Sequence, residues 1–179
     1  MIDPVSCSCV ICADSSVGLD AFDQQTVTHV ERFGRSVVMV PEDETGPGWA
    51  FTIGLHHSFG SPEVAMFGLD LDLMRACLNT LADAIAAGHP MLPGQERDDV
   101  LEGFPVVIKP VHESWYKPLF GAALWFYRRQ PLAFMEMVWP DRDGLFPWDE
   151  NCPSGVRELQ PSLWVSKSEH APGPWAQLP

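Results

Sequence analysis

The sequence predicts a single-domain α+β fold, with a mainly antiparallel sheet of about five strands and about three helices packed on it. Short β-rich segments and amphipathic helical segments are mixed along the 179 residues without strict alternation, unlike the pattern of a parallel βαβ sheet. The composition, 46% hydrophobic and 20% charged residues, is typical of a globular chain that buries one core.

Three segments have the pattern of helices. In residues 19–33 apolar side chains recur on one face, and Gly34 stands where a terminating glycine belongs. Residues 70–87 form the clearest helix, because their apolar residues recur at steps of three and four after capping aspartates. A third helix, apolar nearly all round and therefore buried, is expected within residues 113–129, beginning near Pro118.

Five β-rich segments are expected to form the sheet. Residues 91–103 are polar and predict a loop. Two prolines in residues 104–111 favour an edge or bent strand, whereas residues 132–139 suit a central strand. The predicted strands are 36–40, 49–53, 63–67, 104–111 and 132–139.

The two ends of the chain differ from this middle. Residues 1–17 predict an N-terminal arm that contains cysteines, residues 18–165 the globular α+β domain, and residues 166–179 a loosely packed tail.

The net charge of −13 narrows the classes of partner. Dense negative charge opposes binding to nucleic acid and to anionic membranes, and leaves a basic protein or a small molecule as partners. No segment reaches the about 20 apolar residues that span a bilayer. The N-terminus lacks the pattern of a signal peptide, so we expect a cytoplasmic protein with five reduced cysteines. The oligomeric state does not follow from these observations.

Cys7, Cys9 and Cys12 place three thiols within six residues. They could hold zinc if a fourth ligand, such as Cys152 or a histidine, comes from elsewhere in the chain. Cys9 and Cys12 alone could instead form a redox pair. An arm of reduced thiols without any site is the third interpretation.

His56, His57 and Glu63 lie in or beside a predicted loop between two strands, where functional groups are common. A histidine and a carboxylate could bind a divalent metal or exchange protons with a substrate. Adjacent histidines on an extended chain point in opposite directions, so one of the two is expected to enter a pocket. The alternative is a hydrogen-bonded turn in which Glu63 accepts from loop amides.

Glu136 is a carboxylate in the most apolar predicted strand. Its pKa should rise on burial, unless it pairs with Lys109, His112 or Arg128. A carboxylate with a perturbed pKa is a catalytic candidate, and a structural ion pair or an exposed strand end is the alternative.

The segment WPDRDGLFPW, residues 139–148, offers further candidates. Asp141 could serve as a catalytic carboxylate. A calcium loop would need ligands that are missing, so a turn closed by Asp141 and Gly144 is the simpler interpretation. Trp139 and Trp148 could stack on a flat ligand or cofactor, although tryptophans more often pack in cores.

Six segments follow one another in a fixed order over residues 9–150: CVIC (9–12), FG (33–34), WAFTIGL (49–55), SPEV (61–64), GL (68–69) and WPDRDGLFPW (139–148). This pattern resembles the bacterial family called domain of unknown function 4262. The resemblance implies a bacterial, cytoplasmic, single-domain α/β protein without an established activity, and it assigns no catalytic residue.

The sequence supports two hypotheses of function. The first is a small-molecule-binding or hydrolytic enzyme with a His/carboxylate pocket between residues 54–63 and 139–149. The alternative is a non-catalytic acidic module, of immunity or regulatory type, that binds a basic partner protein. Motifs of nucleotide-binding enzymes, zinc proteases and serine hydrolases are absent, so the sequence does not decide whether the protein is an enzyme.

Overall fold

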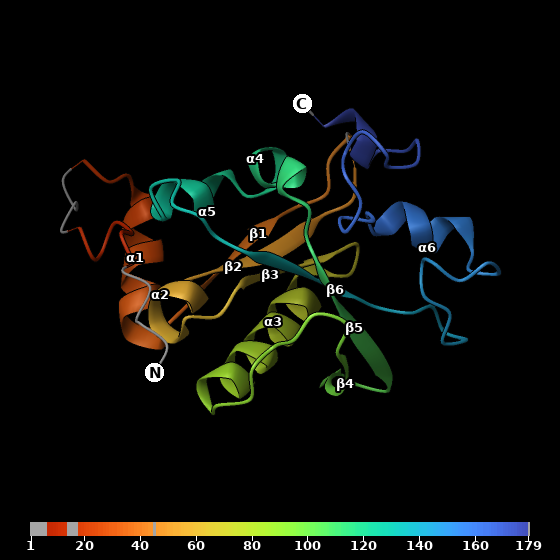
Figure 1. The fold of residues 1–179 in the computed structure, drawn as a ribbon, viewed down its shortest axis with the longest axis horizontal. Coiled ribbons are helices and arrows are strands. Elements are labelled where there is room, and N and C mark those ends of the chain that lie inside the picture. The colour runs from red at the N-terminus through yellow and green to blue at the C-terminus, as the bar shows by residue number, and fades with distance from the viewer. Residues whose placement is uncertain (1–6, 14–17, 45, 179) are drawn as a thin grey trace.

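A six-stranded sheet is the centre of the computed structural model, which describes residues 7–13, 18–44 and 46–178 (Figure 1). The strand order is β1-β2-β3-β6-β5-β4, and every neighbouring pair is antiparallel except β3 with β6. The predicted α+β class is therefore confirmed, with one strand more than expected. The strands are β1 (Ser36–Val40), β2 (Trp49–Ile53), β3 (Glu63–Phe67), β4 (Glu96–Leu101), β5 (Phe104–Pro110) and β6 (Phe134–Val138).

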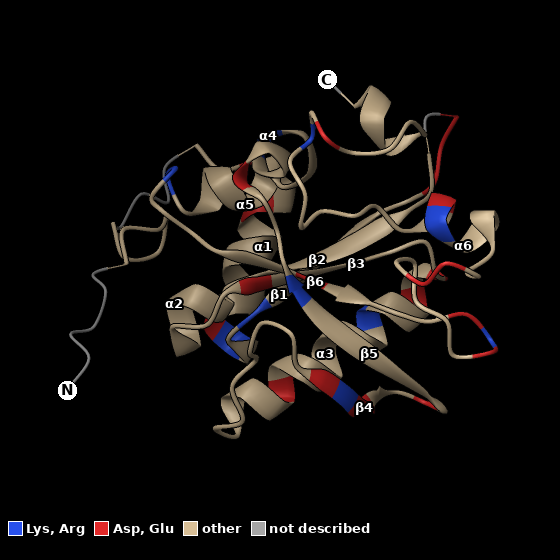
Figure 2. Cartoon of the chain, turned by 45° about the vertical axis from the view of Figure 1, so that its right-hand side comes forward, with Lys and Arg blue, Asp and Glu red and all other residues tan. Residues whose placement is uncertain are grey.

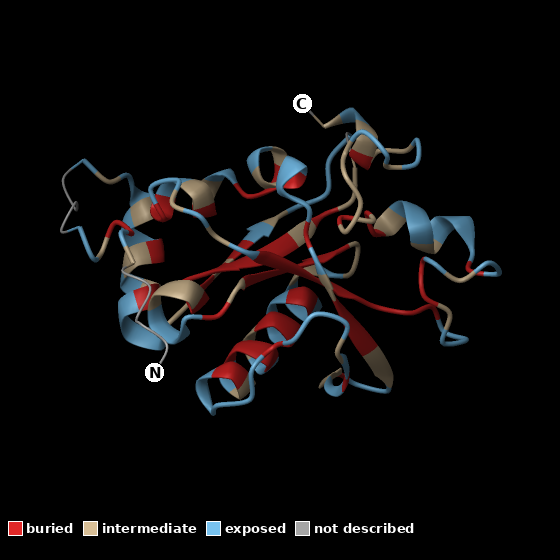
Figure 3. Ribbon diagram, in the orientation of Figure 1, coloured by how far each residue is buried: buried red, intermediate tan, exposed pale blue. Residues whose placement is uncertain are grey.

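Helices cover both faces of this sheet. The long helix α3 lies on one face, and α1, α4 and α5 lie on the other (Figure 1). Figure 3 shows that the side of α3 facing the sheet is buried, as are the central strands. The described helices are α1 (Ala21–Phe33), α2 (Leu55–Phe59), α3 (Leu71–Ala86), α4 (Tyr116–Leu119), α5 (Gly121–Phe126) and α6 (Ser154–Leu159).

The strand β4 was expected to be a loop. Its sequence is polar because it lies at the edge of the sheet, where half of its residues are exposed. The prolines of β5 predicted an edge or bent strand, and β5 is not an edge strand, since it lies between β6 and β4. Pro105 is tolerated there because the pairing of β4 with β5 is irregular between Arg97 and Leu101, opposite this proline.

The predicted helix within residues 113–129 is divided into short pieces. Phe120 leaves the helical region between α4 and α5, with φ −124° and ψ 32°. Pro118 removes a backbone donor and Gly121 lowers helix propensity, which explains why a continuous helix does not form.

Buried side chains fasten both ends of the described chain. Cys9 and Val10 of the arm join the core beside α5, and the Val10 N–H donates to the Phe126 carbonyl at 2.9 Å. Near the C-terminus, Trp175 is only 2% exposed and packs edge-on against Phe67. Residues 1–6 and 14–17 of the predicted arm lie outside the described residues.

The first turn of α3 provides a test of the local structure. Asp70 Oδ1 accepts hydrogen bonds from the N–H groups of Asp72 and Leu73. We expect Asp70→Ala to lower the free energy of unfolding by about 1 kcal/mol in urea denaturation, because both donors lose their acceptor. Asp72→Ala removes an acidic residue from the same turn but only an exposed ion pair with Arg75, so its loss should be smaller. Equal losses in the two variants would contradict the capping role.

Candidate metal centre

Three sulfur atoms of the arm and one ring nitrogen of α2 form a four-residue cluster. The ligand atoms of Cys7, Cys9, Cys12 and His57 all lie within 4.8 Å of one another. His57 Nδ1 lies 3.9, 3.3 and 3.4 Å from the three Sγ atoms, in chain order. Zinc bonds of about 2.3 Å to sulfur and 2.0 Å to nitrogen put tetrahedral ligands roughly 3.5–3.8 Å apart. The cluster therefore has the dimensions of a site for one tetrahedral metal ion.

The arm presents its sulfur atoms from a tight turn that is docked on α5. The Ala13 N–H donates to the Cys9 carbonyl at 3.0 Å, which closes the turn. Upstream, both the N–H and the hydroxyl of Ser8 donate to Gln130 Oε1, at 2.8 and 2.7 Å. These contacts hold the backbone on both sides of Cys9 and Cys12.

Burial disfavours the thiolate form of two of the three cysteines of the cluster. Burial raises the pKa of the Cys9 thiol to about 12, an effect that the neighbouring thiols increase and the Cys12 N–H partly offsets. Burial also raises the pKa of Cys12. A reactive redox cysteine needs the opposite, a lowered pKa and access to solvent, whereas Cys9 is 0% exposed. A bound cation would stabilise the thiolates that burial alone disfavours.

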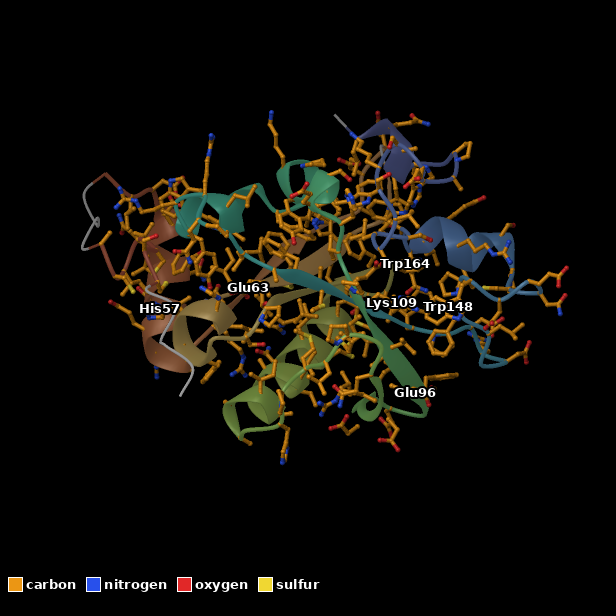
Figure 4. The ribbon with its side chains drawn as sticks, viewed as in Figure 1. His57, Glu63, Glu96, Lys109, Trp148 and Trp164 are labelled. Carbon is orange, nitrogen blue, oxygen red and sulfur yellow. The ribbon has the colours of Figure 1, made fainter. Side chains whose placement is uncertain are left out.

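The helix α2 directs His57 toward the arm, and Figure 4 shows this residue on the side of α2 near the N-terminal segment. The chain turns from β2 into α2 at Gly54, which has φ +116°. A Cβ atom here would lie 2.8 Å from Val30 Cγ2 and 2.9 Å from the Gly34 carbonyl oxygen. Only glycine fits this combination of torsion angle and space.

Glu63 anchors the start of α2 from inside the fold. It is 0% exposed, and its Oε1 accepts from the N–H groups of Gly54 and His56 at 3.0 and 3.1 Å. Its Oε2 accepts from the Thr52 hydroxyl at 2.6 Å. The carboxylate thus satisfies N–H groups that a helix start leaves without partners, the role that the turn interpretation gave to Glu63.

Tyr127 completes this buried network. Its hydroxyl donates to Glu63 Oε1 at 2.5 Å and accepts from the N–H groups of Gly54 and His57, at 2.9 and 3.4 Å. Burial raises the pKa of Glu63, although four donors oppose the shift. Burial and the neighbouring Glu63 raise the pKa of Tyr127, which therefore keeps its proton and remains the donor. Sequence reasoning missed Tyr127, because nothing in its local pattern sets it apart from the apolar helix that it follows.

One of the two adjacent histidines faces the cysteines, as expected, but for another reason. Successive residues of a helix are rotated by about 100°, so His56 and His57 diverge without strand alternation. The His56 ring packs edge-on against Tyr127, with centroids 5.6 Å apart. Burial lowers the pKa of His56, as does the neighbouring His57. His56 is therefore a packing residue beside the cluster rather than a member of it.

The structure separates the two loops that were expected to enclose one pocket. Residues 54–62 precede β3 and residues 139–149 follow β6, and these two strands are parallel. The loops therefore lie at opposite ends of the sheet, so a common pocket between them is not formed. Asp141 belongs to a turn at the far end, where its Oδ1 accepts from the N–H groups of Asp143 and Leu145 at 2.9 and 2.8 Å.

The two candidate tryptophans also lie at that end. The Trp139 indole is 8% exposed and donates to the Phe67 carbonyl at 2.7 Å, so it is largely a core residue. Trp148 is 41% exposed and stacks on Phe146, with centroids 4.7 Å apart and the rings nearly parallel.

Glu136 is buried in the middle of β6 without an ion pair. It is 1% exposed, and its Oε2 accepts from the Leu163 N–H at 3.2 Å. Its Oε1 has no hydrogen-bond partner among the described residues. Lys109 stands directly opposite on β5, but its ammonium lies over the rings of Trp148 and Trp164, at 4.3 and 5.6 Å (Figure 4). Burial raises the pKa of Glu136 well above its usual range, and the Leu163 N–H only partly opposes this shift.

Gly54 and Gly60 form a matched pair for testing the geometry of α2. Both have positive φ, but a Cβ atom at Gly60 would meet nothing within 4 Å. We expect Gly60→Ala to lower the free energy of unfolding by about 1 kcal/mol, from backbone strain alone. Gly54→Ala adds a steric clash and should cost at least about 3 kcal/mol in urea denaturation. Similar losses at the two positions would show that the close contacts of Gly54 are unimportant.

The titration of Glu136 leads to a prediction about pH. The folded protein binds the proton of the Glu136 carboxyl more tightly than the unfolded chain does. The stability that this proton contributes is fully present below the pKa of the unfolded chain. It is lost as the pH rises through the raised pKa of the folded protein. Glu136→Gln cannot titrate. Its free energy of unfolding relative to the wild type should therefore increase by at least about 1 kcal/mol between pH 4.5 and pH 7.5. The exposed Glu96 on β4 supplies the control, since Glu96→Gln makes the same chemical change outside the core and its pH dependence is compared with that of Glu136→Gln. A flat difference for Glu136→Gln would contradict the raised pKa.

Comparison with known proteins assigns a family. The model of the family described as a domain of unknown function, DUF4262, matches residues 29–153, which include His57 but begin after the three cysteines. No curated protein and no solved structure matches the chain. Among the described residues, no helix has the length and apolar character needed to cross a membrane. Since the match covers more than half of the chain, this protein belongs to the DUF4262 family.

Proposed function

We propose that this protein binds one zinc ion through Cys7, Cys9, Cys12 and His57, and that the ion fastens the N-terminal arm to α2. The convergence of four ligand atoms within 4.8 Å supports the proposal. The histidine is 45 to 50 residues away from the cysteines in the sequence. Such convergence needs the folded chain, and it supplies the fourth ligand that three closely spaced cysteines lack.

The chemistry of the ligands favours zinc. Thiolate sulfur is a soft ligand that selects zinc and copper(I) over magnesium and calcium, and imidazole suits zinc as well. A Cys3His set is one of the usual ligand sets of structural zinc sites. Zinc also has no redox chemistry of its own, so it would hold the three thiolates without oxidising them.

The number of protein ligands favours a structural role. Catalytic zinc sites keep a coordination position open for water or substrate, whereas four protein ligands fill a tetrahedron. With His57 bound to the ion, its Nδ1 is not available as a general base. The proposed role is therefore stabilisation of the fold around α2. Under this proposal His57 is not a catalytic residue of a hydrolytic enzyme.

Elemental analysis of the full chain, purified without a chelator, tests the proposal. We expect about one zinc per chain, and uptake of cobalt(II) by the stripped protein with the intense visible absorption of a tetrahedral thiolate site. Removal of the ion should lower the free energy of unfolding by roughly 3–4 kcal/mol relative to protein in zinc at 100–1,000 times Kd. A metal-free chain that takes up neither ion would refute the proposal.

Matched variants separate the site from general effects of substitution. Cys12→Ser removes one of the four proposed ligands and should abolish stoichiometric binding of zinc. Because Cys12 is exposed, this substitution should not disturb the core. Cys77 is a buried thiol on α3 and not part of the cluster, so Cys77→Ser should keep the metal. In the same way, His57→Ala should lose the ion and His56→Ala should keep it. Equal metal content within either pair would contradict the assigned ligands.

A further inference from the structure

A second candidate site lies at the opposite end of the sheet from the cysteine cluster. A cavity of about 720 Å³ opens between the β4–β5 hairpin, α6 and the loop after β6. These elements meet on the right of Figure 1, whereas α2 and α5 lie on the left. The volume falls within the range of small-molecule sites, roughly 300–1,000 Å³. The cavity also lies beyond the carboxyl ends of β3 and β6, the parallel pair of the sheet, where ligands of α/β folds commonly bind.

The wall of this cavity is held in place by buried hydrogen bonds. Gln160 is 2% exposed, and its side chain bonds both backbone groups of Trp139, at 3.0 and 2.9 Å. Leu159 of α6 packs closely on Gly68. A Cβ atom added to Gly68 would lie 2.4 Å from the Leu159 carbonyl oxygen. The loop after β6 and α6 are therefore fixed relative to the ends of the two parallel strands. A cavity with such walls is formed before any ligand binds.

Apolar side chains form most of the lining. Leu73 of α3, Phe104 of β5 and Val156 of α6 approach from three different elements, with Trp139 between them. Leu73 is 41% exposed, so much of this apolar side chain is in contact with water. An apolar ligand would cover this surface and remove it from water.

The charged residues of the lining are mainly acidic. Glu102, Asp141 and Asp143 stand against one base, Arg142. Figure 2 shows acidic residues along the loops beside α6. Asp141 is 9% exposed and uses Oδ1 for the turn, while its Oδ2 accepts no hydrogen bond in the described part of the chain. The cavity therefore offers one largely buried carboxylate, with two further acidic residues and one base in the same lining, next to an apolar wall.

We propose that this cavity binds a small organic cation with an apolar body and an ammonium group. The apolar body packs against Leu73, Phe104 and Trp139, and the ammonium donates to Asp141 Oδ2. Glu102 and Asp143 add long-range attraction for the same charge. The proposal does not depend on the zinc site, because the two sites share no residue and lie at opposite ends of the sheet.

Isothermal titration calorimetry with n-octylammonium and n-octanoate tests this assignment. The two probes have the same apolar chain and opposite charges. We expect saturable one-to-one binding of octylammonium, and octanoate binding at least tenfold weaker. High salt should weaken octylammonium binding, because part of the attraction is electrostatic. No saturable heat up to 5 mM octylammonium, or octanoate binding of equal strength, would overturn the proposal.

Paired variants locate the binding. Leu73→Gln should weaken octylammonium binding at least fivefold, whereas Leu92→Gln, at an exposed leucine outside the cavity, should change it less than twofold. Equal weakening in this pair would indicate non-specific association and would overturn the proposal.

The charge is tested in the same way. Asp141→Asn keeps an acceptor oxygen for the turn and should remove the preference for octylammonium over octanoate. Asp98→Asn makes the same charge change on β4, away from the cavity, and should leave the preference unchanged. If Asp141→Asn does not fold, as judged by circular dichroism, the exposed Asp143→Asn replaces it, with an expected loss of about threefold. Unchanged probe preference in the folded variant would refute the role of the carboxylates.

Discussion

The carboxylate of Glu63 has no contact with solvent, and the start of α2 depends on its hydrogen bonds. A carboxylate buried among apolar strands is costly unless donors surround it. Here the donors are the backbone at the start of the helix and the hydroxyls of Thr52 and Tyr127. The same contacts that compensate for the buried group therefore set the position of the turn that carries His57. The geometry of the candidate metal centre follows from this network, although Glu63 is not a ligand.

The parallel pairing of β3 with β6 divides the molecule into two ends. One end holds the arm, α2 and the cysteine cluster, and the other holds the cavity lined by the loop after β6. A chain of this size buries a single sheet between two layers of helices, so groups at opposite ends cannot share a substrate. A function that uses a single site would therefore involve either the cysteine cluster or the cavity, and not both. The ligand chemistry suggests a division, in which the closed cluster stabilises the fold and the open cavity binds a ligand.

Periodicity predicted those elements whose faces differ in polarity. The helix α3 follows directly from the spacing of its apolar residues. The strands β1, β2 and β3 were predicted from their β-rich composition instead, since β3, for example, is buried at all five residues. The strand β4 could not be predicted in this way, because this half-exposed edge strand is rich in charged residues and has the composition of a loop. The cysteine turn was recognisable as half of a metal site. His57 could not be assigned as the other half, because its proximity to the cysteines depends on the packing of α2 against an arm about 45 residues earlier.

The same arm indicates why a metal would be needed. Ordering the backbone of residues 7–13 costs about 7–10 kcal/mol in conformational entropy, at about 1–1.5 kcal/mol per residue. Burial of Cys9 and Val10 returns about 3–4 kcal/mol. The hydrogen bonds of Ser8, Val10 and Ala13 add about 1 kcal/mol each, or roughly 4 kcal/mol. The two sides nearly cancel, so the arm without an ion is marginally docked at best. Zinc at 100–1,000 times its Kd would add roughly 3–4 kcal/mol to the stability of the docked state, which is enough to make this state dominant when the other contributions nearly cancel. A zinc ion bound to the proposed ligands would therefore stabilise the docked position of the arm.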